Sequence, residues 1–87
     1  MRELKAAAQP ELDIRGMAVD EALPVLDNFL DAAYMGNLPN ARIIHGKGTG
    51  VLRAAVQEEL RRCKYVKSFR LGVYGEGESG VTIVEFK

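Results

Sequence analysis

Apolar and polar residues follow one another along this chain of 87 residues with two different periods. Residues 11–15 alternate between charged and apolar side chains, the period of a half-buried strand that turns Leu12 and Ile14 toward the core. Residues 19–35 have apolar side chains at helical spacing, which predicts a helix with one buried face. Pro24 lies just beyond the first turn of this helix, so its ring is expected to crowd an early carbonyl or to bend the helix.

The second half of the chain repeats the pattern of strand and helix and adds one more strand. We expect a strand over residues 41–45, a helix over residues 51–64, and two further strands over residues 66–71 and 81–86. The glycine-rich residues 72–80 between the last two strands are too many for a tight hairpin turn. The order β-α-β-α-β-β predicts an α/β fold, a two-layer sandwich of two helices on a four-stranded mixed sheet.

Composition indicates one ordinary globular domain. Hydrophobic residues make up 47% of the chain and charged residues 28%, which is typical of a folded protein. We expect residues 11–87 to form the domain and residues 1–10 to be a linker or flexible N-terminal segment that ends at Pro10. No apolar run approaches the ~20 residues that span a bilayer, so we expect a cytoplasmic monomer without membrane contact. The lone Cys63 is expected to be a small core residue.

The chain has no net charge, because its 12 basic and 12 acidic residues cancel. Any site that binds a polyanion therefore has to be a local patch of basic residues. The segment His45-Gly46-Lys47-Gly48-Thr49-Gly50 offers such a patch, since it joins a strand to the start of a helix with few side chains in the way. Backbone N–H groups at a helix start attract anions, phosphate above all, and Lys47 and Arg53 add positive charge. The alternative is structural, because a tight connection also uses glycines for positive φ angles.

Topology brings a second basic segment to the same place. If the first two strands run parallel, Arg15-Gly16 and His45-Gly46 lie at the same carboxyl edge of the sheet. Open α/β sheets bind their ligands at this edge. Two segments far apart in the sequence therefore indicate one binding site.

Three segments resemble the signature motifs of the Smr (small MutS-related) domain: Leu12-Asp13-Ile14-Arg15-Gly16, His45-Gly46-Lys47-Gly48-Thr49-Gly50, and the glycine loop that ends in Ser79-Gly80-Val81-Thr82. The resemblance covers about residues 11–86 and is greatest to the C-terminal domain of bacterial second-family MutS paralogues. It implies a fold similar to the C-terminal domain of translation initiation factor three, nucleic-acid binding and, in several members, endonuclease activity. It also implies a parent chain with a MutS-like ATPase domain, and roles in suppressing homologous recombination, in DNA repair or on stalled ribosomes.

The resemblance assigns roles to single residues. Arg15 stands where members that cleave RNA tend to have histidine, and an arginine holds a phosphate but exchanges no proton. The catalytic residues are then expected to be His45, the only imidazole, with Asp13 and Glu76, acting directly or through Mg²⁺ or Mn²⁺; Glu78 is the alternative to Glu76. No cluster of histidine and cysteine indicates zinc. The residues expected to contact nucleic acid are Arg15, Arg42, Gly46, Lys47, Gly48, Thr49, Gly50, Arg53, Gly77, Ser79 and Gly80.

Two functions from different classes stay open. One is an endonuclease in which His45 and Asp13 move a proton or position water while Arg15, Lys47 and backbone amides stabilise the pentavalent phosphate. The other is a binding module without chemistry that targets a MutS-like ATPase to DNA or ribosomal RNA. His45 also has a structural interpretation as a hydrogen-bonded residue, and Tyr74, which can stack on an unpaired base, has one as an edge of the core. The glycine spacing disfavours a nucleotide-binding P-loop.

Overall fold

The elements found in the computed structural model, which describes residues 10–75 and 78–87, follow the predicted order. Along the chain they are β1 (Glu11–Asp13), α1 (Val19–Met35), β2 (Asn40–Ile44), α2 (Val51–Arg62), β3 (Val66–Leu71), the short 3₁₀ helix η2 (Glu78–Gly80) and β4 (Val81–Phe86). The order β-α-β-α-β-β is therefore confirmed, with η2 as an added turn in the glycine-rich connection. Residues 1–9, most of the expected linker, lie outside the described residues, and the linker stays a prediction.

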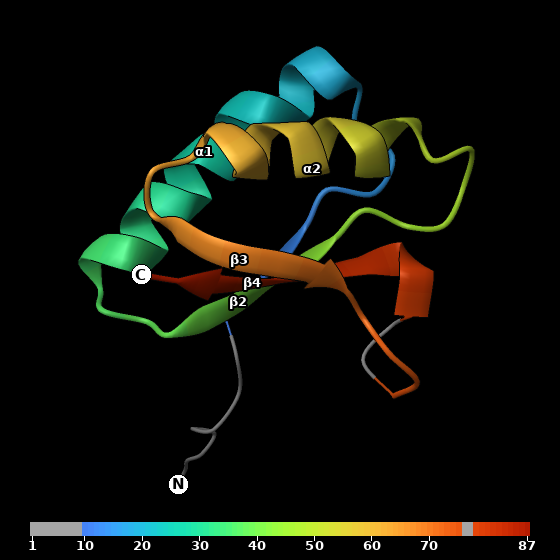
Figure 1. Ribbon diagram of the computed structural model, residues 1–87. Helices are drawn as coiled ribbons and strands as arrows, with labels where there is room; N and C mark the ends of the chain where they lie inside the picture. Colours follow the sequence, from blue (N-terminus) through green and yellow to red (C-terminus); the bar gives the residue numbers. More distant parts are fainter. Residues whose placement is uncertain (1–9, 76–77) are drawn as a thin grey trace, which may run out of the picture.

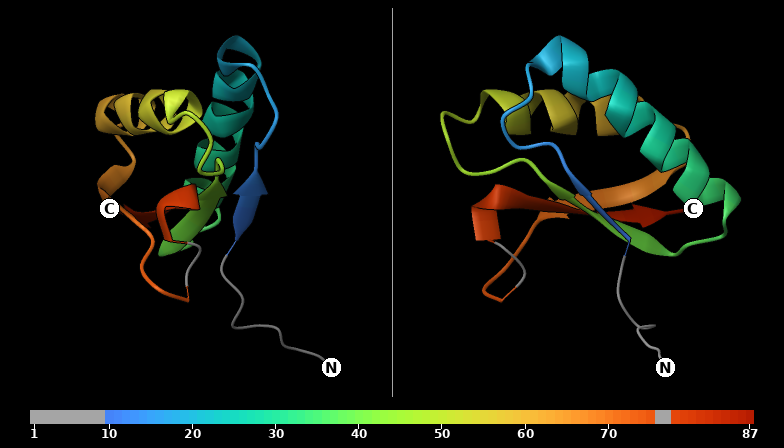
Figure 2. Two further views of the ribbon diagram at one scale, coloured as in Figure 1. Left: turned by 90° about the vertical axis from the view of Figure 1, so that its right-hand side faces the viewer. Right: turned by 180° about the vertical axis from the view of Figure 1, so that it is seen from behind.

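The four strands form one mixed sheet in the order β1-β2-β4-β3. β1 runs parallel to β2, whereas β4 runs antiparallel to both of its neighbours. A parallel pair needs a crossover connection, which α1 supplies between β1 and β2. Both helices lie on one face of the sheet and leave the other face open, as views from several sides agree (Figure 1, Figure 2). The two-layer α/β arrangement is the predicted fold.

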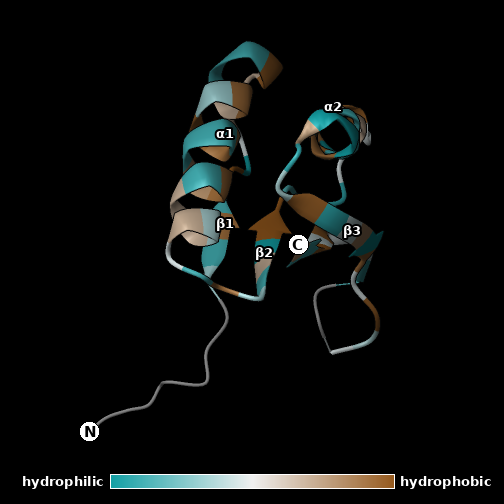
Figure 3. Cartoon of the chain, turned by 60° about the vertical axis from the view of Figure 1, so that its left-hand side comes forward, coloured by the Kyte–Doolittle hydropathy of each residue, from teal (hydrophilic) through white to brown (hydrophobic). Residues whose placement is uncertain are grey.

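The core lies between the helices and the covered face of the sheet. The buried apolar side chains of the helices are Ala22, Leu26, Leu30, Ala33, Val56 and Leu60, and they cluster with Ile14, Ala41, Ile43, Val84 and Phe86. Burial of each Leu or Val is worth about 1.5–3 kcal/mol, so this cluster is the main source of stability. Hydrophobic and hydrophilic stretches alternate along α1 (Figure 3). Neither helix in the described residues is both long enough and apolar enough to cross a membrane.

Some boundaries differ from the expectation for local reasons. β1 ends at Asp13 instead of Arg15, because the Asp13 carboxylate accepts a hydrogen bond from the Arg15 backbone N–H (3.1 Å) and turns the chain out of the sheet. β2 begins and ends one residue earlier than expected. α2 ends at Arg62, because Cys63 adopts an extended conformation with a ψ of 121°. Cys63 packs against the core as expected, and α1 continues through Pro24.

Candidate nucleic-acid interface

The carboxyl ends of β1 and β2 lie side by side, as the topology predicts. Ile14 donates its N–H to the Ile44 carbonyl (2.9 Å), and each chain segment then leaves the sheet through a glycine with positive φ. The Arg15 side chain lies over the second of these, Gly46, where a Cβ atom would come within 3.4 Å of Arg15 Cγ. Because Gly46 has a φ of +81° and no side chain, the turn is unstrained and the arginine stem lies flat on it.

Arg15 is held by the carboxylate of Asp13. The Arg15 Nε and Nη2 atoms donate to the two carboxylate oxygens at 3.0 and 2.6 Å, a bidentate pair in which both side chains are exposed. These hydrogen bonds hold the pKa of Asp13 at about 2, and the carboxylate raises the pKa of Arg15 in turn. Both groups are therefore charged at neutral pH. The pairing fixes the plane of the guanidinium and, among the described residues, leaves its Nη1 edge without a hydrogen bond.

Lys47 lies where the third motif meets the second. Its Nζ is 3.3 Å from Oε1 of Glu78 in η2, and both side chains are exposed. The Gly80 carbonyl accepts the N–H groups of His45 and Gly46 at 3.1 and 2.9 Å. A Cβ on Gly80 would lie 3.4 Å from Lys47 Cγ and 3.5 Å from the Gly46 carbonyl carbon. The two motifs therefore pack closely here, with the lysine stem beside Gly80, and a Cβ atom at position 80 would make ordinary van der Waals contacts.

The two cations border a hollow of about 350 Å³, which we call the open-face hollow. It is lined by Arg15, Arg42, Ile44, Gly46, Lys47, Gly80 and Val81. Ile44 and Val81 alternate along their strands with buried core residues, so the hollow lies on the face of the sheet that the helices leave open. Arg42 is ion-paired, with Nη1 3.1 Å from Oε2 of Glu11. Five of the expected nucleic-acid contacts line this hollow.

Other expected contacts lie on the helix side of the same loop, around a hollow of about 300 Å³ that we call the helix-side hollow. It is lined by residues 16–19 and 45–53. At the start of α2, the first helical N–H is 3.4 Å from Thr49 Oγ1, and Gly50 precedes it with a φ of +88°. Arg53 turns back over Gly50, with its Nη2 3.0 Å from the place of a Cβ. The expected contacts therefore divide between two hollows that share Gly46 and Lys47.

His45 follows β2 and points into the protein, where it is only 5% exposed. Its Nδ1 lies 3.0 Å from the Gly46 carbonyl oxygen, and its Nε2 lies 2.8 Å from Oγ1 of Thr82, which is wholly buried. A carbonyl can only accept a hydrogen bond, so the proton of the neutral ring is on Nδ1 and the Thr82 hydroxyl donates to Nε2. Both ring nitrogens are therefore engaged inside the protein.

Burial lowers the pKa of His45 below its ordinary value. The hydrogen bond to Gly46 raises this pKa, and the positive charge of Arg53 lowers it further. His45 is thus neutral at pH 7. To accept a proton from water, Nε2 has to release the Thr82 hydroxyl. Asp13 is an ionised carboxylate at this pH, which can orient water or hold a cation but has no proton to give.

The remaining expected site residues belong to the third motif. Ser79 is half-buried in η2. Glu76 and Gly77 lie outside the described residues. Within residues 10–75 and 78–87, no three histidine, cysteine, aspartate or glutamate side chains gather into a group that could hold a metal ion. A role for Mg²⁺ or Mn²⁺ stays a prediction.

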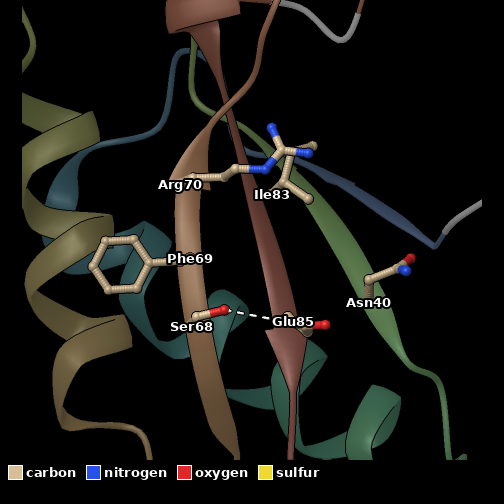
Figure 4. A pocket seen from close by; sticks show the side chains of 6 residues that line it. All are labelled: Asn40, Ser68, Phe69, Arg70, Ile83 and Glu85. Carbon is tan, nitrogen blue, oxygen red and sulfur yellow. Dashed lines mark hydrogen bonds between the residues drawn. The ribbon is translucent and has the colours of Figure 1, made fainter.

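A further hollow of about 260 Å³ continues the open face of the sheet toward β3. It is lined by Asn40, Ser68, Phe69, Arg70, Ile83 and Glu85. Ile83 pairs with Arg42 on one side and with Arg70 on the other, so the two arginines flank it in one row across the sheet. Arg70 extends toward Ile83 while Ser68 donates a hydrogen bond to Glu85 at 3.1 Å (Figure 4).

With this geometry established, the chain can be compared with known proteins. Residues 12–87 match the family model of the Smr domain. The chain belongs to the Smr domain family. The resemblance predicted from three short motifs is therefore confirmed.

Relatives of this Smr domain are found in much longer proteins. The chain is 59% identical over 78 residues to Endonuclease MutS2 of Lachnoclostridium phytofermentans, a match that covers 90% of this chain and 10% of that protein. It is 53% identical over 85 residues to Endonuclease MutS2 of Caldanaerobacter subterraneus subsp. tengcongensis, with 98% of this chain and 11% of that protein covered. The chain thus spans about a tenth of the length of these relatives.

Two solved structures share the fold of this Smr domain. The Smr domain of Thermus thermophilus MutS2 superposes with a TM-score of 0.87 at 47% identity, covering 90% of this chain and 98% of that one. YdaL, a stand-alone small MutS-related protein from Escherichia coli, superposes with a TM-score of 0.86 at 25% identity, covering 97% and 71%. The two-helix, four-stranded architecture is therefore that of known Smr domains.

The third motif ends in Thr82, but the sequence assigned this residue no role, although it fixes the ring of His45. Thr82 pairs in register with Ile43 of β2, on the covered face of the sheet. The available signal was a threonine at an inward position of an apolar strand, because a buried hydroxyl needs a hydrogen-bond partner. In this Smr domain the partner is the only histidine of the chain.

Proposed function

We propose that this Smr domain binds the phosphates of a nucleic acid at the carboxyl edge of β1 and β2. We further propose that it is a weak nicking endonuclease, which cleaves a phosphodiester bond at this edge. The observation that carries the proposal is the placement of Arg15 and Lys47 across Gly46 and Gly80 on one hollow. Together with Arg42 they make three cations on this open surface, and a DNA or RNA backbone has the complementary charge. The name Endonuclease MutS2 of the relatives supports the same reaction.

The proposed cleavage uses the charged groups in different ways. Attack of water on phosphorus builds negative charge on the non-bridging oxygens, and Arg15 and Lys47 offset that charge within hydrogen-bond distance. The Asp13 carboxylate, ionised because its pKa is about 2, orients the attacking water. If a Mg²⁺ or Mn²⁺ ion takes part, Asp13 and Glu76 would be the carboxylates that hold it, and the ion would offset negative charge on the phosphate. As the new P–O bond forms, the bond from phosphorus to one ester oxygen breaks, and that oxygen leaves with a proton from solvent. The proton of the attacking water goes to solvent or to His45, which lines the helix-side hollow and accepts it after its Nε2 has released the Thr82 hydroxyl.

A second candidate function is favoured by the hydrogen bonds of His45. With Nδ1 on Gly46 and Nε2 on Thr82, the imidazole exchanges no proton with a ligand, and Arg15 exchanges none at any relevant pH. The domain then acts as a non-catalytic module that binds DNA or ribosomal RNA and targets a MutS-like ATPase to it. For either function, the family resemblance suggests a cytoplasmic parent protein that suppresses recombination or acts on stalled ribosomes.

A nicking assay distinguishes the two functions. Supercoiled plasmid DNA and structured RNA are incubated with Mg²⁺, Mn²⁺ or chelator and with wild type, Lys47→Ala or Arg61→Ala, all purified identically. Arg61 is a matched control, because it is an exposed cation on α2 that pairs with Glu58 and lines neither hollow at the sheet edge. If the domain cleaves, Lys47→Ala reduces nicking at least ~10-fold and Arg61→Ala leaves it unchanged. Equal nicking by all three proteins indicates a contaminating nuclease and favours the binding module.

Replacement of Arg15 by histidine tests whether this position separates cleaving from binding members. An imidazole exchanges protons near neutral pH, so Arg15→His is expected to increase nicking and to make its rate depend on pH around ~6.5. The assay is the same one, run from about pH 5 to 9. A rate that stays flat over this range while binding persists would contradict the role assigned to position 15.

A further inference from the structure

Tyr74 differs from the other tyrosines of the chain in having no partner in the described residues. Tyr34 and Tyr65 stack with their ring centroids 4.4 Å apart, and the Tyr65 hydroxyl donates to Asp31. Tyr74 is 92% exposed and, among the described residues, takes part in no ring contact, ion pair or hydrogen bond. It is therefore not an edge of the core, which was the structural interpretation of this residue.

The connection that carries Tyr74, between β3 and β4, contacts residues that line the open-face hollow through Gly72 and through Glu78. At one end Gly72 donates its N–H to the Val81 carbonyl at 2.9 Å. At the other end Glu78 pairs with Lys47 at 3.3 Å. Val81 and Lys47 both line the open-face hollow. The loop lies on the side of the sheet away from the helices (Figure 2). The exposed aromatic ring thus stands two residues beyond a backbone contact with the lining of the open-face hollow.

The backbone next to Tyr74 leaves room for a flat ligand. Gly75 follows with a φ of +89°, and a Cβ atom there would meet no atom within 4 Å. Val73, on the other side, is 58% exposed. Apart from the chain neighbours of Gly75, no described atom therefore occupies the space beside this glycine that a planar group would need.

We propose that Tyr74 stacks on an unpaired nucleobase while the open-face hollow holds a nearby phosphate, so that the domain prefers single-stranded segments to duplex. This inference rests on the proposed nucleic-acid binding and adds a specificity residue to it. Aromatic stacking accepts every base, because every base has a π-face. Bases inside a duplex are already stacked, and flipping one out costs a few kcal/mol. Tyr74 therefore selects for strandedness and not for sequence.

Fluorescence anisotropy with labelled oligonucleotides tests the stacking. The probes are a single strand of about 12 nucleotides, a typical site size, its duplex, and the same strand with abasic sites in place of the bases, each as DNA and as RNA. The proteins are wild type, Tyr74→Ala, Tyr74→Phe, which keeps the ring, and Arg15→Ala. Because Tyr74 is exposed and unpartnered, its variants are expected to fold as wild type does, which circular dichroism checks.

Tyr74→Ala is expected to weaken single-strand binding by about 5- to 100-fold and to change duplex and abasic-strand binding by less than about twofold. Tyr74→Phe binds as wild type does, whereas Arg15→Ala weakens every probe. A loss on DNA, on RNA or on both supports the proposal. The stacking proposal is wrong if Tyr74→Ala keeps the single-strand affinity of wild type, or if it loses affinity equally on all probes. In that case, weaker binding by Arg15→Ala than by wild type would still support phosphate binding at the open-face hollow. If wild type binds no probe, the proposed function fails as well.

Discussion

At the scale of single residues, the neighbours of His45 determine how this histidine titrates. The Gly46 carbonyl and the Thr82 hydroxyl hold the ring, and burial lowers its pKa. In the unfolded chain the His45 imidazole takes up a proton near pH 6.5, whereas in the folded protein the same imidazole stays unprotonated to a lower pH. His45 therefore contributes stability that is complete above about pH 6.5 and is lost as the pH falls through the folded-state pKa.

Thr82→Val, which removes the hydroxyl and keeps the shape, is expected to lower the free energy of unfolding by about 1–3 kcal/mol, because Nε2 of His45 loses its donor in a buried site. Urea denaturation measures the loss. NMR of the imidazole nitrogens is expected to show the Nδ1–H tautomer in wild type and in Thr82→Ser, which keeps the hydroxyl. A Thr82→Val protein as stable as wild type would mean that this hydrogen bond does not hold the ring. An Nε2–H tautomer in wild type would mean that Nε2 donates to the hydroxyl and that Nδ1 does not donate to the Gly46 carbonyl.

At the scale of elements, the pattern of the sequence predicted every helix and strand to within two residues, because periodic burial is a local property that the residues themselves report. The pattern did not predict where β1 ends, since the Asp13 side chain competes there with the backbone ladder for the Arg15 N–H. It also missed η2, which begins at Glu78 with a φ of +52°. Both features depend on side-chain geometry and on an uncommon backbone angle, which periodicity does not encode.

The loop before α2 offers a matched pair of glycines. Gly50 has a φ of +88°, and a Cβ there would lie 3.0 Å from Nη2 of Arg53, whereas a Cβ on Gly48 would meet nothing within 4 Å. Gly50→Ala is expected to destabilise the domain by about 1–2 kcal/mol, the cost of a left-handed conformation for a residue with a side chain. Gly48→Ala is expected to cost less than ~0.5 kcal/mol. Equal losses in thermal unfolding would show that the left-handed angle is not what the loop requires.

The two helices meet at a pair of carboxyl groups. Desolvation and the hydrogen bond to Glu59 of α2 raise the pKa of Asp27 in α1 to about 6, while hydrogen bonds to Asp27 and Arg62 lower the pKa of Glu59. Asp27 holds its proton more tightly in the folded than in the unfolded protein. Its contribution to stability is therefore present below about pH 4 and is lost as the pH rises through about 6.

In Asp27→Asn the side-chain amide donates a hydrogen bond to Glu59 at every pH, whereas Asp27 does so only when it is protonated. The variant is expected to raise Tm by about 1–3 °C at pH 7.5, and the gain is small because the pair is near the surface. At about pH 4.5, where Asp27 itself is protonated in the folded protein, the gain should be close to zero. Glu58→Gln on α2 is the control, since it loses a pairing with Arg61 and gains nothing. Calorimetry at the two pH values measures the change in Tm. A gain that does not depend on pH would argue against a hydrogen bond from protonated Asp27 to Glu59.

At the scale of the whole molecule, the first turn of α1 is acidic, whereas the carboxyl edge of the sheet has cations that are each paired with a carboxylate. α1 begins with Asp20 and Glu21, whereas Arg15 and Lys47 gather at the carboxyl edge of the sheet. The chain has no net charge, so a polyanion is bound through a few local contacts and not through a long-range field. Topology allowed the sequence to locate this edge. It did not reveal that the contacts divide between two hollows, because that depends on the side of the loop to which each side chain turns.

The salt dependence of binding to duplex DNA tests the central claim most directly. The plot of log affinity against log salt concentration is expected to have a slope of about −3 for wild type, since three or four phosphates are neutralised. Arg15→Ala and Lys47→Ala should each reduce the slope by about one without unfolding the domain, while Arg61→Ala on α2 leaves it unchanged. A wild-type slope near zero, or an Arg61→Ala slope reduced as much as those of the other two variants, would contradict a phosphate site at the carboxyl edge of β1 and β2.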